Sequence, residues 1–342
     1  STSDGYPFGA VKKLDNYEQG ALSILYIVFA TKDVRSLNSD YLATYFDTDR
    51  WYKGVSERAA EGARNHGLLN ISADDFFDID VTLSNEIDEQ EKIAAFIYSL
   101  NNLITLHQRK LDKLLNIKKS MLDKMFPKNG SKKPEIRFKG FTDDWEQRKF
   151  VSFFCMLSNN TLSRAELSDS GTIKNIHYGD ILVKFGEIID SKHDNLPFVV
   201  DERKLGKNSS LENGDIVIAD TAEDITAGKC VEVMVETGVK VVSGLHTIPC
   251  RPYQQYARGY LAYYMNSPSY HNQLVPLMQG TKVTSISKSA LQETELSFPY
   301  AIKEQACLGR LFIALDHLIT LHQRKLEKLK NLKKACLDKM FV

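Results

Sequence analysis

The nine residues LITLHQRKL at positions 103–111 recur without change at 318–326, which is 215 positions further along the chain. Extended without a gap, residues 100–126 match residues 315–341 at 20 of 27 positions. An exact match of this length does not arise by chance, and internal repeats indicate a structural unit that is used more than once. The chain therefore contains one segment twice.

Both copies have the pattern of a long helix. In the first copy, Leu100, Ile104, His107 and Leu111 are spaced three or four residues apart, with Lys and Arg between them and no Gly or Pro inside. About 40 residues at 1.5 Å per residue give a rod of roughly 60 Å. Two such rods are predicted to pack as a coiled coil. The predicted packing positions are Ile104, Leu111, Leu114, Ile319, Leu326 and Leu329.

The repeat extends upstream of the helices. The offset of 215 also relates Ile71-Ser72 to Ile286-Ser287, and YLATYF at 41–46 resembles YLAYYM at 260–265 at an offset of 219. About 152 residues separate Pro134 from Ile286, but only 70 precede Ile71, so the first unit is expected to be shorter by roughly 80 residues. The repeat unit is therefore a globular part followed by a helix.

The segment PKNGSKKP at 127–134 predicts an exposed linker that ends the first helix. Residues 135–297 have the pattern of a mixed β region with short helices. Two apolar runs, GDILVKF at 179–185 and GDIVIAD at 214–220, are predicted to be buried strands. Val231–Val235 and Val239–Val242 are predicted to form a hairpin.

Several kinds of chemistry lack a sequence signal. No phosphate-binding loop, dinucleotide fingerprint, HExxH or GxSxG motif occurs, so neither a catalytic nor a metal site is predicted. Five scattered cysteines without a CxxC pair favour reduced thiols in a cytoplasm. The longest strongly apolar stretch, 21–30, is about half as long as a membrane-spanning helix, so a soluble protein is expected. The 44 basic residues balance the 44 acidic residues, so attraction to nucleic acid would depend on local patches.

Short polar loops are the best candidates for a binding function. QGTKVTSIS at 279–287 contains a glycine and a lysine, and EGARNHGLLNIS at 61–72 holds the equivalent place in the first unit. Side chains of these types can make directional hydrogen bonds to base edges. The alternative for 279–287 is an ordinary loop between a helix and a strand. The predicted DNA-binding residues are Arg64, Asn65, His66, Lys184, Lys229, Gln279, Gly280, Thr281, Lys282 and Thr284.

The ordered combination is a helix ending in LDKMF, a linker, PEIRFKGFTDDWEQRK at 134–149, a β-rich region with GDI segments, and a second helix ending in LDKMF. It resembles the specificity subunit of type I restriction-modification enzymes. The resemblance implies an α+β fold in which mixed α/β target recognition domains are separated by two long helices packed as an antiparallel coiled coil. The implied parts are a partial first recognition domain at 1–85, spacer helices at 86–126 and 298–342, a linker at 127–133 and a second recognition domain at 134–297.

The resemblance also implies a function. A specificity subunit reads a bipartite target in double-stranded DNA and has no catalytic site or cofactor of its own. Its partners are two modification subunits, which use S-adenosylmethionine, and restriction subunits, which use ATP to translocate and cleave DNA. The helices would then set the gap between the two half-sites.

Two alternatives stay open at this point. The chain could be a stand-alone coiled-coil adaptor whose globular heads bind proteins. It could also be a metal-dependent nuclease that uses acidic pairs such as Asp143-Asp144 or Glu223-Asp224, although paired surface acids are common at turns and helix starts.

Overall fold

The computed structural model describes residues 8–15, 19–24, 26–61, 69–128, 130–205 and 210–341. Contacts divide the chain into unit 1, residues 1–112 with 321–342, and unit 2, residues 113–320. The mixed helix and sheet composition agrees with the predicted fold class. Within the described ranges, no helix has both the length and the apolar character needed to cross a membrane.

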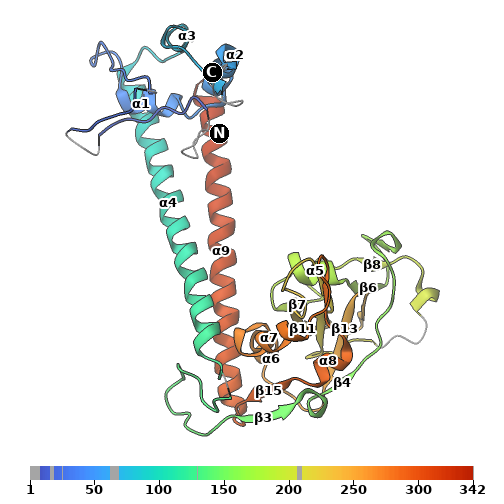
Figure 1. Cartoon of the computed structure of the whole chain (residues 1–342). Helices are drawn as coiled ribbons and strands as arrows, with labels where there is room; N and C mark the ends of the chain where they lie inside the picture. The colour runs from blue at the N-terminus through green and yellow to red at the C-terminus, as the bar shows by residue number, and fades with distance from the viewer. Residues whose placement is uncertain are drawn as a thin grey trace. The chain divides into compact units, whose positions relative to one another are not determined.

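The two longest helices are α4 (Ile87–Lys124) and α9 (Ile302–Met340), and each contributes residues to both units (Figure 1). They have 38 and 39 residues, so the repeated segment is helical in both copies, as predicted. Acidic residues lie in the first turn of each helix and a lysine in the last turn, which suits the helix dipole.

Unit 2 contains most of the strands. Five form a mixed sheet in the order β4-β13-β9-β11-β7, four form a second sheet in the order β12-β6-β8-β5, and two further pairs are β10 with β14 and β15 with β3. Their bounds are β3 (Glu146–Lys149), β4 (Phe154–Met156), β5 (Leu167–Ser168), β6 (Ile173–Ile176), β7 (Ile188–Asp190), β8 (Phe198–Val199), β9 (Ile216–Ala219), β10 (Thr221–Ala222), β11 (Cys230–Met234), β12 (Lys240–Ser243), β13 (Thr247–Pro252), β14 (Thr284–Ser285) and β15 (Glu295–Phe298).

Strand β9 lies at the centre of the larger sheet and is covered on both faces. Ile216 and Ile218 belong to a core shared with α6 (Tyr260–Asn266) and α7 (Pro268–Leu274). Val217 and Ala219 point into a second core, shared with α5 (Tyr178–Val183). Because both faces are buried, the strand is continuously apolar instead of alternating. The prediction of a buried strand in GDIVIAD is confirmed.

Two sequence predictions in unit 2 are wrong. GDILVKF forms helix α5 and not a strand, and the His177 side chain caps it by accepting the Gly179 N–H at 3.2 Å. Periodicity cannot separate a short buried helix from a short buried strand. The second error is the hairpin over 231–242, because β11 pairs with β7 and β9, whereas β12 pairs with β6 in the other sheet.

Unit 1 repeats the final part of unit 2 in the same order. Its elements are α1 (Ser39–Tyr45), α2 (Asp49–Arg58), β1 (Ala60–Glu61), β2 (Leu69–Asn70) and α3 (Ala73–Phe77), followed by α4. The counterparts in unit 2 are α6, α7, a bridged hairpin, α8 (Lys288–Gln292) and α9. Ser72 and Ser287, related by the offset of 215, cap α3 and α8 through equivalent hydrogen bonds of 3.0 and 3.1 Å.

The repeat also holds for buried contacts. Gln90 and Gln305 occupy equivalent positions on α4 and α9, and both are buried. The Gln90 Oε1 atom accepts the backbone N–H of Asn38 at 2.8 Å, and the Gln305 Oε1 atom accepts that of Ala257 at 3.2 Å. Each long helix therefore holds the start of the short helix in its own unit in the same way.

An aromatic contact is duplicated in the same manner. Phe126, just after α4, lies 5.5 Å from the ring of Tyr264, and Phe341, just after α9, lies 5.6 Å from the ring of Tyr45. The two tyrosines come from the similar YLAYYM and YLATYF segments. The repeat predicted from sequence is thus confirmed as a globular part with its helix.

Candidate nucleic-acid interface

The segment 279–285 is a closed hairpin and not an irregular loop. The Gln279 N–H donates to the Ser285 carbonyl at 2.9 Å, and the Ser285 N–H donates to the Gln279 carbonyl at 2.8 Å. Gly280 has φ of 107°, and a Cβ atom there would lie 1.9 Å from the Val283 carbonyl oxygen. Glycine is therefore required by both the backbone conformation and the space.

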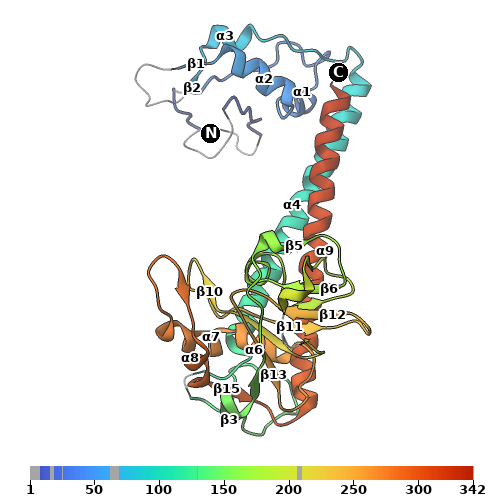
Figure 2. The same ribbon diagram turned by 90° about the vertical axis from the view of Figure 1, so that its right-hand side faces the viewer.

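The hairpin has a buried base and an exposed tip. Ile286 is 3% exposed and anchors the base in the unit 2 core, whereas Thr281, Lys282 and Val283 are exposed. Thr284 lies in β14, which pairs antiparallel with β10 at the edge of the unit (Figure 2). The predicted residues from Gln279 to Thr284 are thus brought together on one hairpin with an exposed tip.

The equivalent hairpin in unit 1 is closed by β1 and β2, in which Ala60 pairs with Asn70. Nine residues lie between this pair, against five between Gln279 and Ser285, so the change of offset from 219 to 215 falls in the hairpin. The predicted residues Arg64, Asn65 and His66 belong to this connection and lie outside the described residues. Length and sequence therefore differ at this loop, whereas the short helices on either side of it correspond in the two units.

Lys184 and Lys229 are bonded within unit 2. The Lys229 ammonium donates to the carbonyls of Leu182 at 3.1 Å and Phe185 at 3.3 Å, at the end of α5, and burial lowers its pKa. Lys184 is exposed, donates to the Asn195 carbonyl and lies over the Phe185 ring. The structure does not group these lysines with the hairpin tip, and their DNA contacts stay a prediction.

A polar cluster beside the hairpin was not predicted from the sequence. His246 Nδ1 lies 3.3 Å from Asp220 Oδ1, and the Thr221 hydroxyl donates to the same oxygen at 2.7 Å. The ring of Tyr178 meets the imidazole edge-on at 5.3 Å between centroids. These residues come from three separate segments, so only the folded sheet brings them together.

The same side of α5 carries a strong ion pair. Arg164 binds the buried Asp180 carboxylate through two hydrogen bonds of 2.8 and 2.9 Å, and this contact raises the pKa of the guanidinium. Burial, and then the positive charge of Arg164, lowers the pKa of the neighbouring His177 imidazole. The Arg164 charge is already balanced by a fixed partner.

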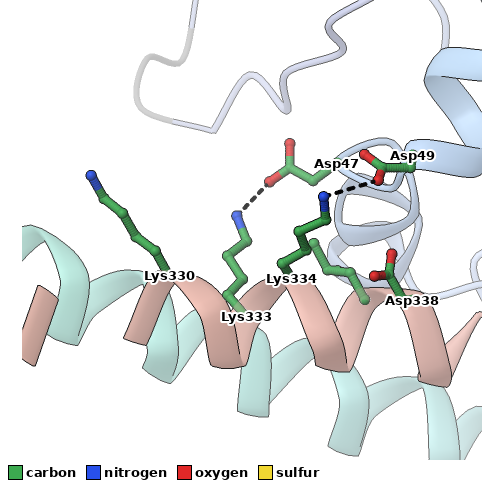
Figure 3. Close-up of a pocket in the computed structure, with 7 residues that line it drawn as sticks. Asp47, Asp49, Lys330, Lys333, Lys334 and Asp338 are labelled. Atoms are coloured by element: carbon green, nitrogen blue, oxygen red, sulfur yellow. Dashed lines mark hydrogen bonds and ion pairs between the residues drawn. The ribbon is translucent and has the colours of Figure 1, made fainter. Parts of the chain in front are cut away.

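A small pocket in unit 1 lies where α9 meets the segment between α1 and α2 (Figure 3). Lys333 bonds to Asp47 at 3.0 Å, and Lys334 lies 3.6 Å from Asp49. Three lysines and three aspartates line the pocket, so their formal charges cancel. This arrangement attaches the globular part to its helix and offers no preference for an anion.

Lys118 is the residue of α4 equivalent to Lys333 and is attached more firmly. Its ammonium lies 2.9 Å from Glu187 and 2.7 Å from Asp316. Burial lowers the pKa of Lys118, but the two carboxylates outweigh burial and raise that pKa above its usual value. Burial also raises the pKa of the Glu187 carboxyl. The equivalent lysines thus both bind a globular part, Lys118 on α4 that of unit 2 and Lys333 on α9 that of unit 1.

The predicted helix-packing residues lie at inward positions. Leu111, Ile319 and Leu326 are each 7% exposed, Leu114 packs on the core of unit 2, and Leu329 packs on the core of unit 1. Ile104 is half-buried. The Nδ1 atoms of His107 and His322 lie 2.8 Å apart, so the two helices meet through the same residue of each copy.

Comparisons with known proteins identify the class of fold. The S subunit of a type I restriction-modification system from M. genitalium superposes with a TM-score of 0.54 at 13% identity, covering 91% of this chain and 74% of that one. A second solved chain, from a structure described as the basis of complex assembly and conformational transition of the type I R-M system, superposes with a TM-score of 0.54 at 14% identity. The match covers 90% of this chain and 72% of that one. The fold is that of type I S subunits.

The chain is also similar in sequence to a named curated protein. The chain is 24% identical over 286 residues to the type I restriction enzyme MjaVIII specificity subunit of Methanocaldococcus jannaschii, which covers 80% of this chain. The match spans 63% of the length of that relative. No family model matches the chain. The predicted resemblance to type I specificity subunits is confirmed in sequence and in fold.

Proposed function

We propose that this chain is a DNA sequence-specificity subunit of a type I restriction-modification complex, which reads a bipartite target in double-stranded DNA. The observation that carries the proposal is the duplicated hairpin, closed by Ala60 and Asn70 in unit 1 and by Gln279 and Ser285 in unit 2. Equivalent helices support both hairpins, but their tips differ in length and sequence. Two unlike readers on one shared frame suit a target with two unlike halves.

Each part of the chain has a role in this function. Residues 1–85 and 134–297 act as target recognition domains, the first of them partial, and 127–133 is the linker. The segments 86–126 and 298–342 are spacer helices packed as an antiparallel coiled coil. Support comes from the contacts of His107 with His322 and of Lys118 with Asp316. The residue number rises along α4 but falls along α9 between these two contacts, as in an antiparallel pair.

The chemistry belongs to partners in this proposal. Two modification subunits methylate adenine with S-adenosylmethionine, restriction subunits translocate and cleave DNA with ATP, and this chain acts as scaffold without a catalytic site or cofactor. The neutral net charge fits that division, since partner subunits can supply much of the phosphate-binding surface.

A binding experiment separates this function from that of a protein-binding adaptor. We expect the chain with its modification subunits to bind one short duplex sequence at least a hundredfold more tightly than random duplexes at fixed salt. An adaptor would form the protein complex without any sequence preference. A nuclease would instead cleave DNA with Mg²⁺ in the absence of partners, and substitution of Asp143 and Asp144 would abolish the cleavage.

A further inference from the structure

His246 has a backbone conformation that histidine rarely adopts. It lies in the turn between β12 and β13 with φ of 53°, and it alone has positive φ among the non-glycine residues that the structure describes. The left-handed region costs a side-chain-bearing residue about 1 kcal/mol or more. Glycine would fill the position without this cost.

The imidazole is held in one orientation. The Nδ1 atom lies 3.3 Å from Asp220 Oδ1 and 3.5 Å from the Thr221 hydroxyl oxygen, which itself donates to Asp220, and the Tyr178 ring packs against the imidazole edge. Two oxygens beside Nδ1, one of them a carboxylate, favour the tautomer that carries its proton there, which leaves Nε2 as the acceptor for a ligand. The side chain is 47% exposed, so the imidazole is open to a ligand.

Backbone hydrogen bonds join His246 to the hairpin. The Asp220 N–H donates to the His246 carbonyl at 3.1 Å, and the Asp220 carbonyl accepts the Ile286 N–H at 2.8 Å. The next residue, Thr221, pairs with Ser285 at the hairpin base. The orientation of His246 is therefore fixed relative to the exposed tip at 281–283.

We propose that His246 is a base-reading residue of unit 2, a role that rests on the proposed DNA-recognition function. Its Nε2 accepts a hydrogen bond from the exocyclic amino group of an adenine or cytosine in the groove that the hairpin tip enters. Asp220 is the positioning residue that holds the imidazole. The neighbouring charged and titratable groups are Tyr178, His177 and Arg164, the last of which is neutralised by Asp180.

The test is the H246G variant in complex with the modification subunits. Glycine relieves the left-handed strain but also frees the unfolded chain, so the two effects nearly cancel and the unfolding midpoint should stay about equal. An equal midpoint, measured beside the motif, excludes a folding defect. Mapping of methylated adenines should show one base position of one half-site relaxed by about tenfold. The other half-site and the gap should be unchanged.

A matched control uses the second histidine–aspartate pair of the unit. His193 lies 3.0 Å from Asp190, the last residue of the edge strand β7. Asp190 pairs with Met234 at one end of β11, whereas the β9 end that leads to Asp220 pairs near Cys230 at the other end. H193A should leave the motif unchanged. An unaltered motif in H246G, or a uniform loss of methylation at all sites, would overturn the base-reading role. Absence of methylation with the unaltered chain would instead reject the proposed function itself.

Discussion

Gly280 shows how one residue decides the form of the candidate reading loop. Substitution by alanine adds a Cβ atom 1.9 Å from a carbonyl oxygen, in addition to the cost of positive φ. We expect G280A to open the hairpin and destabilise unit 2 by about 2–3 kcal/mol. Recognition of one half-site should be lost while the partners still assemble.

Gly238 provides the control for G280A. It also has positive φ, 83°, but a Cβ atom there would meet no atom within 4 Å. G238A should therefore cost only about 1 kcal/mol and leave the DNA target unchanged. Equal losses in the two variants, measured by chemical denaturation and methylation mapping, would contradict a specific role for the hairpin geometry.

Glu232 on β11 should make stability depend on pH. It is 5% exposed, its carboxylate accepts the Gly259 N–H at 2.8 Å, and burial raises its pKa to about 7. The folded chain then holds a proton that the unfolded chain has lost. The free energy of unfolding should fall by up to about 3 kcal/mol as pH rises from about 4.5 to about 7.

The E232Q variant checks this expectation, because glutamine keeps an acceptor for Gly259 but does not titrate. Its unfolding free energy should change less between pH 4.5 and 8 than that of the unaltered chain, and it should be the more stable of the two above pH 7. The same pH dependence in both proteins would rule out Glu232 as its source.

The sequence identified part of the candidate site at this scale. The hairpin at 279–285 was found because the repeat and Gly280 mark it. His246 was missed, since its conformation and its contact with Asp220 depend on strands that meet only in the fold. Lys229 was predicted to bind DNA because no local sequence pattern reveals that its ammonium donates to the Leu182 and Phe185 carbonyls within unit 2.

At the scale of elements, the equivalent lysines of α4 and α9 should differ in their contribution to stability. The side chains of Lys118 and Glu187 are 17% and 13% exposed, so K118M removes the hydrogen-bonded cation from a poorly solvated Glu187 carboxylate and from Asp316 as well. We expect a loss of about 3 kcal/mol in unit 2. Lys333 and Asp47 are 21% and 27% exposed with one contact of 3.0 Å, and K333M should cost about 1 kcal/mol.

Hydrogen exchange measured separately over the segments of each unit would check these values. K118M should raise exchange mainly in residues 146–298, and K333M mainly in residues 38–77. Equal effects of the two variants, or no effect of K118M, would contradict the assignment of Lys118 as the stronger attachment.

Long elements were predicted better than short ones. The expected limits of the long helices, 86–126 and 298–342, exceed the observed ones by a few residues. Over some 40 residues the three-and-four spacing is unambiguous. The run GDILVKF is too short for such a pattern, and its helix depends on the His177 cap and on burial against the sheet. The local sequence also cannot predict that β11 pairs with β9 and that β12 pairs with β6, because these partners are distant in the chain.

At the scale of the whole molecule, the chain contains the same series of short helices, hairpin and long helix twice, and unit 2 carries additional sheets. Equivalent glutamines and aromatic residues contact the short helices α1 and α6 or a residue shortly before them, and equivalent serines cap α3 and α8. The sheets of unit 2 have no counterpart among the described residues of unit 1. Under the proposed function, the shared frame would serve common assembly and the unlike hairpins would read two different half-sites.

The most direct test of this account is a genome-wide map of methylated adenines made by the chain with its modification subunits and S-adenosylmethionine. We predict a split motif with two specific half-sites and a fixed gap, and relaxation confined to one half-site in G280A. Methylation at a continuous motif, or an assembled complex that methylates without any sequence preference, would contradict the proposed function.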